Sequence, residues 1–413
     1  MVWDRATGAP IARAIVWQDR RTAPAMEALR AAGRERMVRE ATGLALDPYF
    51  SGSKLAWILD HVEGARDRAS RGELAAGTID SWILWSLTSG HVHATDASNA
   101  SRTMLARIGG EAGAAWDDGL CELLRVPRAV LPEIVDSAGV VATCDPSLLG
   151  AAIPVAGIAG DQQAALFGQS CLARGEAKCT FGTGCFLLVH AGDRAPAAPE
   201  GLLATVAWRI AGRASYAIEG SVFVGGSAVQ WLRDGLQLIA KASEVNALAA
   251  EAADAGGVVV VPAFAGLGAP WWDAAARGAI LGVTRGTTRA HLARATLEGV
   301  AHQVADLVEA IEAAGVEVGS LRVDGGAAAS DLLMQFTADL SGVAVERPRI
   351  LETTALGVAM LARAGATGEA PSGDALSIER RFEPATGASA RNEARARWRR
   401  AVEAVRFFGR PVA

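Results

Sequence analysis

Four glycine-rich segments, each placed at the end of an apolar run, constrain the fold more than any other feature of this chain. They read AGDQQ (159–163), FGTGCF (181–186), VGGSAVQ (224–230) and VDGGAAAS (323–330). Glycine lets the backbone turn sharply and lets a ligand approach it closely. Strands that end in such turns and alternate with helical segments indicate an α/β protein.

The expected strands are short and apolar. They cover 12–18, 151–160, two strands around the Gly-Thr-Gly turn within 175–192, 214–220, 256–264 and 321–326. Helical periodicity predicts helices at 22–33, 227–253, 288–315 and 388–407. In the last helix Trp398, Val402 and Val405 fall on one face, which predicts packing against the protein. With 413 residues the chain suits two lobes, which we expect to join near residue 170.

Composition excludes several classes of protein. The net charge is −5, which argues against nucleic-acid partners and a basic membrane anchor. The five cysteines are an odd number without a CxxC pair, so we predict neither disulfides nor zinc, and a reducing cytoplasm. The longest uncharged run, 255–272, is broken by Gly and Pro, so no membrane span is expected.

Asp161 follows an apolar run and precedes a helix-like one. At the carboxyl end of a strand, where α/β sheets bind ligands, its carboxylate could take a proton from a substrate hydroxyl. Gln162 could then hydrogen-bond a neighbouring hydroxyl. The alternative is that Asp161 merely caps the helix that follows, and sequence alone does not decide between the two.

Two of the glycine turns could hold phosphate. Thr183 lies between glycines and could offer a hydroxyl and an N–H group, although a hairpin turn that needs positive φ explains FGTGCF equally well. The pair Gly325–Gly326 ends a strand, and Ser330 could cap the following helix. A tight turn is the commoner use of such a pair.

Two other features carry alternatives. Tyr49, in YFSGSKLAWI (49–58), has a ring and hydroxyl that suit a small polyol, or it is a core aromatic. His91 and His93 could form a metal pair, but loop histidines are the simpler interpretation, since no HxxxH or HExxH spacing occurs.

Taken together, these motifs resemble the FGGY carbohydrate kinases. YFSGSKLAWI matches one family signature and GAILGVTRGTTRAHLARATLE (278–298) matches the other. The segments AIVWQDRRT (14–22), GIAGDQQAALFGQ (157–169), FGTGCF, PAFAGLGAPWWD (262–273) and RVDGGAAASDLLMQF (322–336) are similar to the glycerol-specific members. The resemblance covers nearly the whole chain.

The resemblance implies two actin-like, ribonuclease-H-like domains with a nucleotide cleft between them: 1–170 on the glycerol side and 171–413 on the nucleotide side. It implies phosphorylation of glycerol by ATP with Mg²⁺, and a homodimer or homotetramer. Asp161 matches the catalytic base. The implied substrate contacts are Tyr49, Asp161, Gln162, Trp17 and Phe186, and the implied nucleotide contacts are Thr183, Gly226, Gln230, Gly326 and Ser330. No residue of this sequence is assigned to the metal, and Ser330 replaces an Asn common in the family.

Two departures from the family qualify these expectations. Members begin with a D-x-G-T-x-S turn and later carry an Arg-Glu pair that binds glycerol, whereas this chain starts at MVWDRATG, after both. We therefore expect a first domain without its leading strands and an impaired activity. Alternatives are a kinase for another small polyol or dihydroxyacetone, or a non-catalytic remnant. The segment CDPSLLGAA (144–152) lacks a basic fructose-bisphosphate loop, so we predict no such inhibition.

Overall fold

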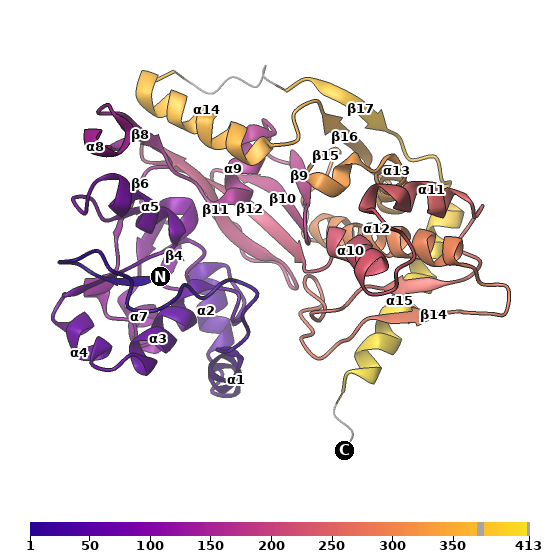
Figure 1. The fold of residues 1–413 in the computed structure, drawn as a ribbon, viewed down its shortest axis with the longest axis horizontal. Helices are drawn as coiled ribbons and strands as arrows, with labels where there is room; N and C mark the ends of the chain where they lie inside the picture. The colour runs from indigo at the N-terminus through magenta and orange to yellow at the C-terminus, as the bar shows by residue number, and fades with distance from the viewer. Residues whose placement is uncertain (370–375, 411–413) are drawn as a thin grey trace.

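The computed structural model describes residues 1–369 and 376–410, and it arranges them as two lobes joined by one large sheet (Figure 1). Nine strands form this sheet in the order β17-β16-β15-β9-β10-β12-β11-β7-β8. Their bounds are Ala138–Thr143 (β7), Pro154–Gly157 (β8), Ala177–Phe181 (β9), Cys185–Gly192 (β10), Leu203–Ile210 (β11), Arg213–Val222 (β12), Ser320–Asp324 (β15), Ala344–Pro348 (β16) and Ile378–Phe382 (β17). The pairs β15–β9, β15–β16 and β11–β7 are parallel and the others antiparallel, so the sheet is mixed.

One face of the sheet is covered by helix α12 (Arg289–Ala313), which forms the centre of the largest hydrophobic core. Its side chains Leu297, Val304 and Leu307 belong to the same buried cluster as Cys179 and Leu187 of β9 and β10. Thr288 begins the helix by accepting a hydrogen bond from the His291 N–H group. The long helix predicted at 288–315 is therefore confirmed, and 16 of its 25 residues are buried.

The opposite face is covered by α9 (Asp161–Gly168) and α14 (Thr353–Thr367), which cross each other closely. A Cβ atom at Gly357 would lie 1.8 Å from the carbonyl oxygen of Ala164, and one at Gly168 would lie 2.1 Å from that of Thr353. The two helices thus touch backbone to backbone, which only glycine allows. This contact fixes α9, and with it Asp161, against a helix from late in the sequence.

The same face carries charged side chains that the strand register aligns. Four residues are register partners across β15, β9, β10 and β12. In that order they are Arg322, Lys178, Leu188 and Glu219. In the adjacent row Asp324, Thr180, Phe186 and Ser221 are opposite one another. Because side chains two residues apart share a face, both rows point toward α9.

The first lobe contains small sheets and short helices around a core of its own, which includes Val38, Leu44, Phe50, Leu55 and Ile58. The helices are Ala23–Ala31 (α1), Glu35–Thr42 (α2), Ser51–His61 (α3), Ala65–Ser70 (α4), Ile79–Leu87 (α5), Ala97–Ala100 (α6), Asp118–Leu123 (α7) and Pro146–Leu149 (α8), with a 3₁₀ turn at Arg128–Val130 (η1). The two-stranded sheets pair Val2–Asp4 (β1) with Leu74–Ala76 (β2), Ala94–Asp96 (β3) with Glu133–Val135 (β6), and Ala106–Ile108 (β4) with Ala114–Trp116 (β5).

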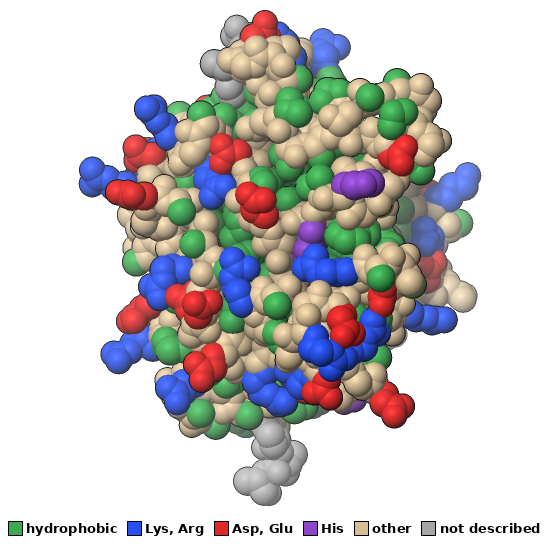
Figure 2. Space-filling view, turned by 90° about the vertical axis from the view of Figure 1, so that its left-hand side faces the viewer, with side chains coloured by type: hydrophobic (Ala, Val, Ile, Leu, Met, Phe, Trp, Pro, Cys, Tyr) green, Lys and Arg blue, Asp and Glu red, His purple; other side chains and the backbone are tan. Residues whose placement is uncertain are grey.

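Exposed hydrophobic side chains gather on the outer face of the first lobe, in the upper part of Figure 2. The exposed hydrophobic residues of the chain include Ile79 and Ile83 of α5, Val140 of β7, and Leu148 and Leu149 of α8, each at least half exposed. Charged side chains of both signs cover the lower part of this face.

The second lobe contains further helices and strands besides those of the large sheet. They are Gly226–Asp234 (α10), Ala242–Glu244 (η2), Val245–Ala250 (α11), Val259–Val261 (β13), Ala279–Leu281 (β14), Gly326–Ala329 (η3), Asp331–Ser341 (α13) and Ala388–Phe408 (α15). As predicted, Trp398, Val402 and Val405 of α15 are buried. Arg395 of this helix is also buried and forms an ion pair with Asp306 of α12, which ties α15 to the core.

Three expected elements differ from the structure. Residues 12–18 form no strand: Ala12 and Ile15 pack their side chains against the first-lobe core without a partner strand. The segment 151–160 contains a strand only at Pro154–Gly157 (β8), which is at the sheet edge and is partly buried. The helix predicted at 227–253 is interrupted after Asp234 and resumes at Val245.

Candidate active site

A cavity of about 420 Å³ opens between the glycine turns of the second lobe. All five residues predicted to contact a nucleotide line it: Thr183, Gly226, Gln230, Gly326 and Ser330. They come from the β9–β10 turn, α10, η3 and the start of α13, so segments up to 147 residues apart (330 − 183) converge on one space. The roles of these residues stay predictions, but their common location is a finding.

The Gly-Thr-Gly turn is held by the second glycine turn. The carbonyl oxygen of Thr183 accepts hydrogen bonds from the Gly225 N–H group at 2.7 Å and from the Ser227 hydroxyl at 2.8 Å. None of residues 182–184 has positive φ, so the interpretation that the hairpin needs this conformation is wrong. Gly184 is needed for space instead, because a Cβ there would lie 2.3 Å from the carbonyl oxygen of Val222.

In the Gly325–Gly326 pair the first glycine forms a tight turn and the second leaves free space in the cavity. Gly325 has φ +84°, and a Cβ there would meet the carbonyl oxygen of Phe181 at 2.7 Å. Around Gly326 no atom lies within 4 Å of the place that a Cβ would take. The first glycine therefore serves the fold, whereas the second leaves the cavity free for a bound group.

Ser330 caps α13, as predicted, by accepting a hydrogen bond from the Leu333 N–H group at 3.1 Å. Its hydroxyl also donates to Oδ1 of Asn246 at 2.5 Å. Asn246 lines the cavity from α11 and was not predicted from the sequence. The one local signal is that Asn246 is the only polar residue in the helix sequence VNALAA.

On the acceptor side, aromatic rings from both lobes meet. The ring of Trp17 lies 5.5 Å from that of Tyr49 and 6.0 Å from that of Phe186, both edge to face. The ring of Phe223, which sequence reasoning missed, lies 6.4 Å from Trp17. The three predicted aromatic contacts are thus brought together, and the cluster joins the two lobes.

Asp161 begins α9 with an exposed side chain, and its charge is near enough to Tyr49 to raise the pKa of that residue. The N-cap is Gly160 and no side chain caps the helix, so the interpretation of Asp161 as a mere cap is wrong. Its Oδ1 accepts a hydrogen bond from the Gln162 N–H group at 2.8 Å. An exposed carboxylate fixed in this way can accept a proton from a bound hydroxyl.

Beneath Gln162 lies a fully buried lysine that the sequence analysis did not single out. The Lys178 ammonium donates to Oε1 of Gln162 at 2.5 Å and to the Thr180 hydroxyl at 2.8 Å. Burial lowers the pKa of Lys178, while the charges of Asp324 and Asp161 act in the opposite direction. Oδ1 of Asp324 is buried without a hydrogen-bond partner among the described residues.

A buried ion pair between Arg102 and Glu219 lies beside Tyr49. Nη2 of Arg102 donates to Oε1 of Glu219 at 2.7 Å, and the guanidinium lies 5.7 Å from the centre of the Tyr49 ring. Burial, together with the charges of Glu219 and Asp161, raises the pKa of Tyr49 well above its ordinary value. The Tyr49 hydroxyl is therefore neutral and can both donate and accept hydrogen bonds.

The histidine pair does not form a metal site. His91 and His93 contact separate carbonyl oxygens, those of Thr88 at 2.6 Å and Ala76 at 3.0 Å. Within residues 1–369 and 376–410, no group of three His, Cys, Asp or Glu side chains is arranged to hold a metal ion. In the same part of the chain, no helix combines the length and hydropathy that a membrane crossing requires.

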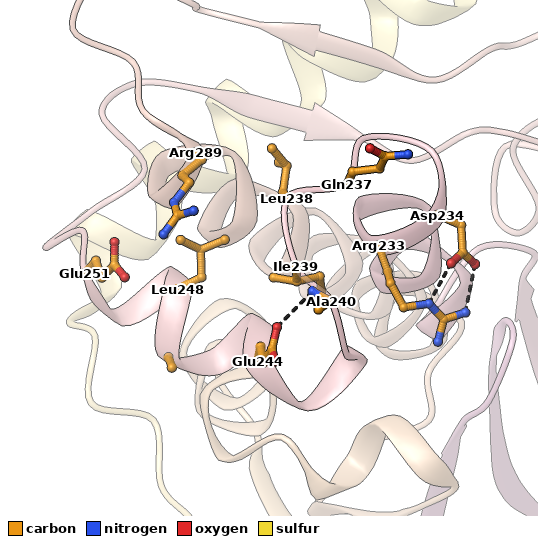
Figure 3. A pocket seen from close by; sticks show the side chains of 11 residues that line it. Arg233, Asp234, Gln237, Leu238, Ile239, Ala240, Glu244, Leu248, Glu251 and Arg289 are labelled. Atoms are coloured by element: carbon orange, nitrogen blue, oxygen red, sulfur yellow. Dashed lines mark hydrogen bonds and ion pairs between the residues drawn. The ribbon is translucent and has the colours of Figure 1, made fainter.

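A larger hollow of about 850 Å³ adjoins the nucleotide-side cavity and shares Arg233 with it (Figure 3). Arg233 donates to both carboxylate oxygens of Asp234, and Glu244 accepts from the Ala240 N–H group, so these charges are already satisfied within the protein. Figure 3 shows Leu238 and Leu248 between them and Arg289.

Comparison of the sequence with known families decides the assignment. The sequence profile for the N-terminal domain of the FGGY family of carbohydrate kinases matches residues 1–168, and the C-terminal profile matches residues 177–366. The chain belongs to the FGGY family of carbohydrate kinases. It is therefore an ATP-dependent phosphotransferase with the mixed α/β, two-domain fold of that family, as the motifs predicted.

Several similar proteins are named glycerol kinase, and two of them show the extent of the match. That of Aromatoleum aromaticum is 56% identical, with 98% of this chain and 82% of the relative covered. That of Dechloromonas aromatica is also 56% identical, with 98% and 80% covered. Neither comparison supports the expected incomplete first domain or impaired activity, because the matches extend over nearly all of this chain.

Solved structures agree with this FGGY assignment. The ADP complex of Plasmodium falciparum glycerol kinase superimposes with a TM-score of 0.89 at 33% identity, covering 98% of this chain and 81% of that one. A xylulose kinase from Brucella ovis gives 0.86 at 24% identity, covering 98% and 82%, and it supports the fold alone.

Proposed function

We propose that this kinase transfers the terminal phosphoryl group of ATP to glycerol and forms sn-glycerol 3-phosphate. One observation carries the proposal: the β9–β10 hairpin links Thr183, in the nucleotide-side cavity, to Phe186, in the aromatic cluster with Trp17 and Tyr49. The proposed nucleotide site and the proposed glycerol site are therefore adjacent, because Thr183 and Phe186 are only three positions apart in the chain. The names of the relatives that are 56% identical favour glycerol over other polyols.

In the proposed reaction, Trp17, Tyr49 and Phe186 contact the carbons of glycerol, and Gln162 hydrogen-bonds one of its hydroxyl groups. Asp161 accepts the proton of the attacking hydroxyl as that oxygen bonds to the phosphorus. The oxygen that bridged this phosphoryl group to the rest of ATP leaves with ADP. The aromatic cluster excludes water, which would otherwise compete as the acceptor.

The nucleotide fits the chain's own residues. ATP would occupy the cavity between Thr183, Gly226, Gln230, Gly326 and Ser330, where the open wall at Gly326 leaves room for it. Mg²⁺ characteristically binds through substrate phosphates, water and one or two carboxylates. A chain without a three-ligand cluster in its described residues is compatible with that mode, and Asp161 offers an exposed carboxylate. When bound, the ion would neutralise phosphate charge.

We assign residues 1–170 to the acceptor side and 171–413 to the nucleotide side. The aromatic and cavity residues support this division, except that Phe186 reaches the acceptor from the second part. All five cysteines are unpaired, which agrees with a reducing cytoplasm. A homodimer or homotetramer and the lack of inhibition by fructose bisphosphate stay predictions.

A coupled assay of the purified chain with ATP and Mg²⁺ tests the function. Glycerol should yield ADP and glycerol 3-phosphate in equal amounts, with kcat/KM above that for dihydroxyacetone. Asp161→Asn should reduce kcat by about 10²–10⁴-fold, the usual contribution of a general base, and leave ADP binding intact. Greater activity on dihydroxyacetone would favour the alternative substrate, and ADP binding without turnover of any polyol would favour the non-catalytic alternative.

A further inference from the structure

Gln162 can face a substrate in two ways, and its carboxamide decides which. One end of this group only accepts hydrogen bonds and the other only donates them, so a half-turn of the amide reverses what the substrate meets. In this kinase Oε1 faces the Lys178 ammonium at 2.5 Å. An ammonium has three donors and no acceptor, so it selects the oxygen and excludes the NH₂ group from this position.

The position of Lys178 in the sheet directs its side chain toward Gln162. It is 0% exposed, and its position on β9 faces α9 in the same register row as Arg322 and Glu219. Its two hydrogen-bond partners among the described residues, Gln162 and Thr180, are neutral. A buried ammonium is costly unless its donors are satisfied, so the Gln162 oxygen stabilises the lysine as much as the lysine fixes the amide.

We propose that Lys178 is a positioning residue that locks Gln162 as a hydrogen-bond donor toward the acceptor substrate. This inference rests on the proposed function for its substrate. With Oε1 held by Lys178, the Nε2 group is on the other side of the amide and presents its N–H groups away from the sheet. Asp161, which directly precedes Gln162 in the chain, only accepts hydrogen bonds when its carboxylate is ionised. The pair therefore offers one acceptor and one donor to adjacent oxygen atoms of a polyol.

The locked donor has a consequence for specificity. A hydroxyl oxygen and a carbonyl oxygen both accept a hydrogen bond from an N–H group, so Gln162 tolerates either at the position it contacts. A carboxylate at residue 162 would instead demand a hydroxyl, because it only accepts. Gln162→Glu should keep its contact with Lys178 and reduce kcat/KM for dihydroxyacetone by about tenfold more than that for glycerol.

Lys178→Met tests the positioning role, because Met has a similar volume and no charge. The KM for glycerol should rise about tenfold and the KM for ATP should stay within about twofold, as expected for one lost hydrogen bond on the acceptor side. Lys178→Arg, which also only donates, should restore part of the affinity. Arg36→Met removes an exposed positive charge on α2 and should change neither constant.

A double-variant cycle separates positioning from simple structural support. If Lys178 acts through Gln162, Lys178→Met combined with Gln162→Ala should raise the KM for glycerol no more than Gln162→Ala alone. Additive effects, or an equal rise in the KM for ATP, would overturn the proposal.

The side-chain amide resonances of Gln162 give a readout that needs no turnover. They should shift on Lys178→Met in the folded, ligand-free protein, and unchanged resonances would also overturn the proposal. If the native chain fails to phosphorylate glycerol while these resonances shift, the proposed substrate is wrong and the positioning of Gln162 stands.

Discussion

Arg102 and Glu219 form an ion pair across the two lobes in which the guanidinium is 16% exposed and the carboxylate 0%. The pair is incompletely satisfied, because Nη1 of Arg102 and Oε2 of Glu219 are buried without hydrogen-bond partners among the described residues. A buried pair of this kind contributes little compared with hydrophobic packing, but losing one member leaves the other charged and uncompensated.

Arg102→Met should therefore lower the free energy of unfolding by about 3–5 kcal/mol. The matched control is Arg107→Met, since Arg107 pairs with Asp117 at the same 2.7 Å but is 60% exposed. Loss of that surface pair should cost about 1 kcal/mol or less. Chemical unfolding of both variants measures the difference, and equal costs would show that the buried pair has no special weight.

The titration of His93 predicts a loss of stability in acid. Burial lowers the pKa of His93 from 6.5 to about 4. Between these values the unfolded chain binds a proton that the folded chain does not, so the free energy of unfolding falls as pH falls, by about 1.4 kcal/mol per pH unit. Between about pH 6 and pH 5, His93→Phe should therefore reduce the pH dependence of the free energy of unfolding by about 1.4 kcal/mol per pH unit.

Above the unfolded pKa both proteins should show the same dependence on pH, because the imidazole is neutral in both states there. Unfolding measured at a series of pH values provides the slopes. Parallel curves for the native protein and His93→Phe throughout the acid range would contradict the assignment to this histidine.

Gly357→Ala should destabilise the protein, although alanine is normally the better helix former by about 1 kcal/mol. The added Cβ would lie 1.8 Å from the Ala164 carbonyl oxygen, so α9 and α14 must separate. Because α9 begins at Asp161, kinase activity should fall together with the melting temperature. Gly319→Ala, where the new atom meets nothing within 4 Å, is the control and should leave both unchanged.

Gly326→Val should impair ATP binding without destabilising the protein. The new side chain has open space and points into the nucleotide-side cavity, so the melting temperature should be unchanged while the KM for ATP rises by about tenfold or more. Glycerol affinity should not change. A normal KM for ATP would mean that the nucleotide binds elsewhere.

The sequence predicted the elements whose signals are local. The β9–β10 hairpin, α12 and α15 follow from apolar periodicity and glycine turns, whereas the five cavity residues were implied by the resemblance to the FGGY kinases. Segment 12–18 has the composition of a strand but finds no partner, and its Trp17 ring is anchored by other aromatic side chains instead. Whether a segment finds a partner strand depends on the whole fold, so the composition of 12–18 could not predict it.

The buried charges could not be predicted for a related reason. Lys178, Glu219 and Asp324 come from three strands far apart in the sequence, and only the register aligns them on one face. In isolation each is one polar residue at the end or middle of an apolar strand. A lysine in the strand AKCTF, flanked by small and apolar residues, is the one signal that could have been noticed, because a lysine there must be buried.

The backbone contact between α9 and α14 constrains how the two lobes can move. Two helices interlocked through glycines cannot slide apart without losing their closest packing, so a rotation of one lobe against the other must take its axis near that crossing. In the proposed function Asp161 would then lie near the axis of such a rotation, where displacement is least, and a bound nucleotide would move toward the proposed base.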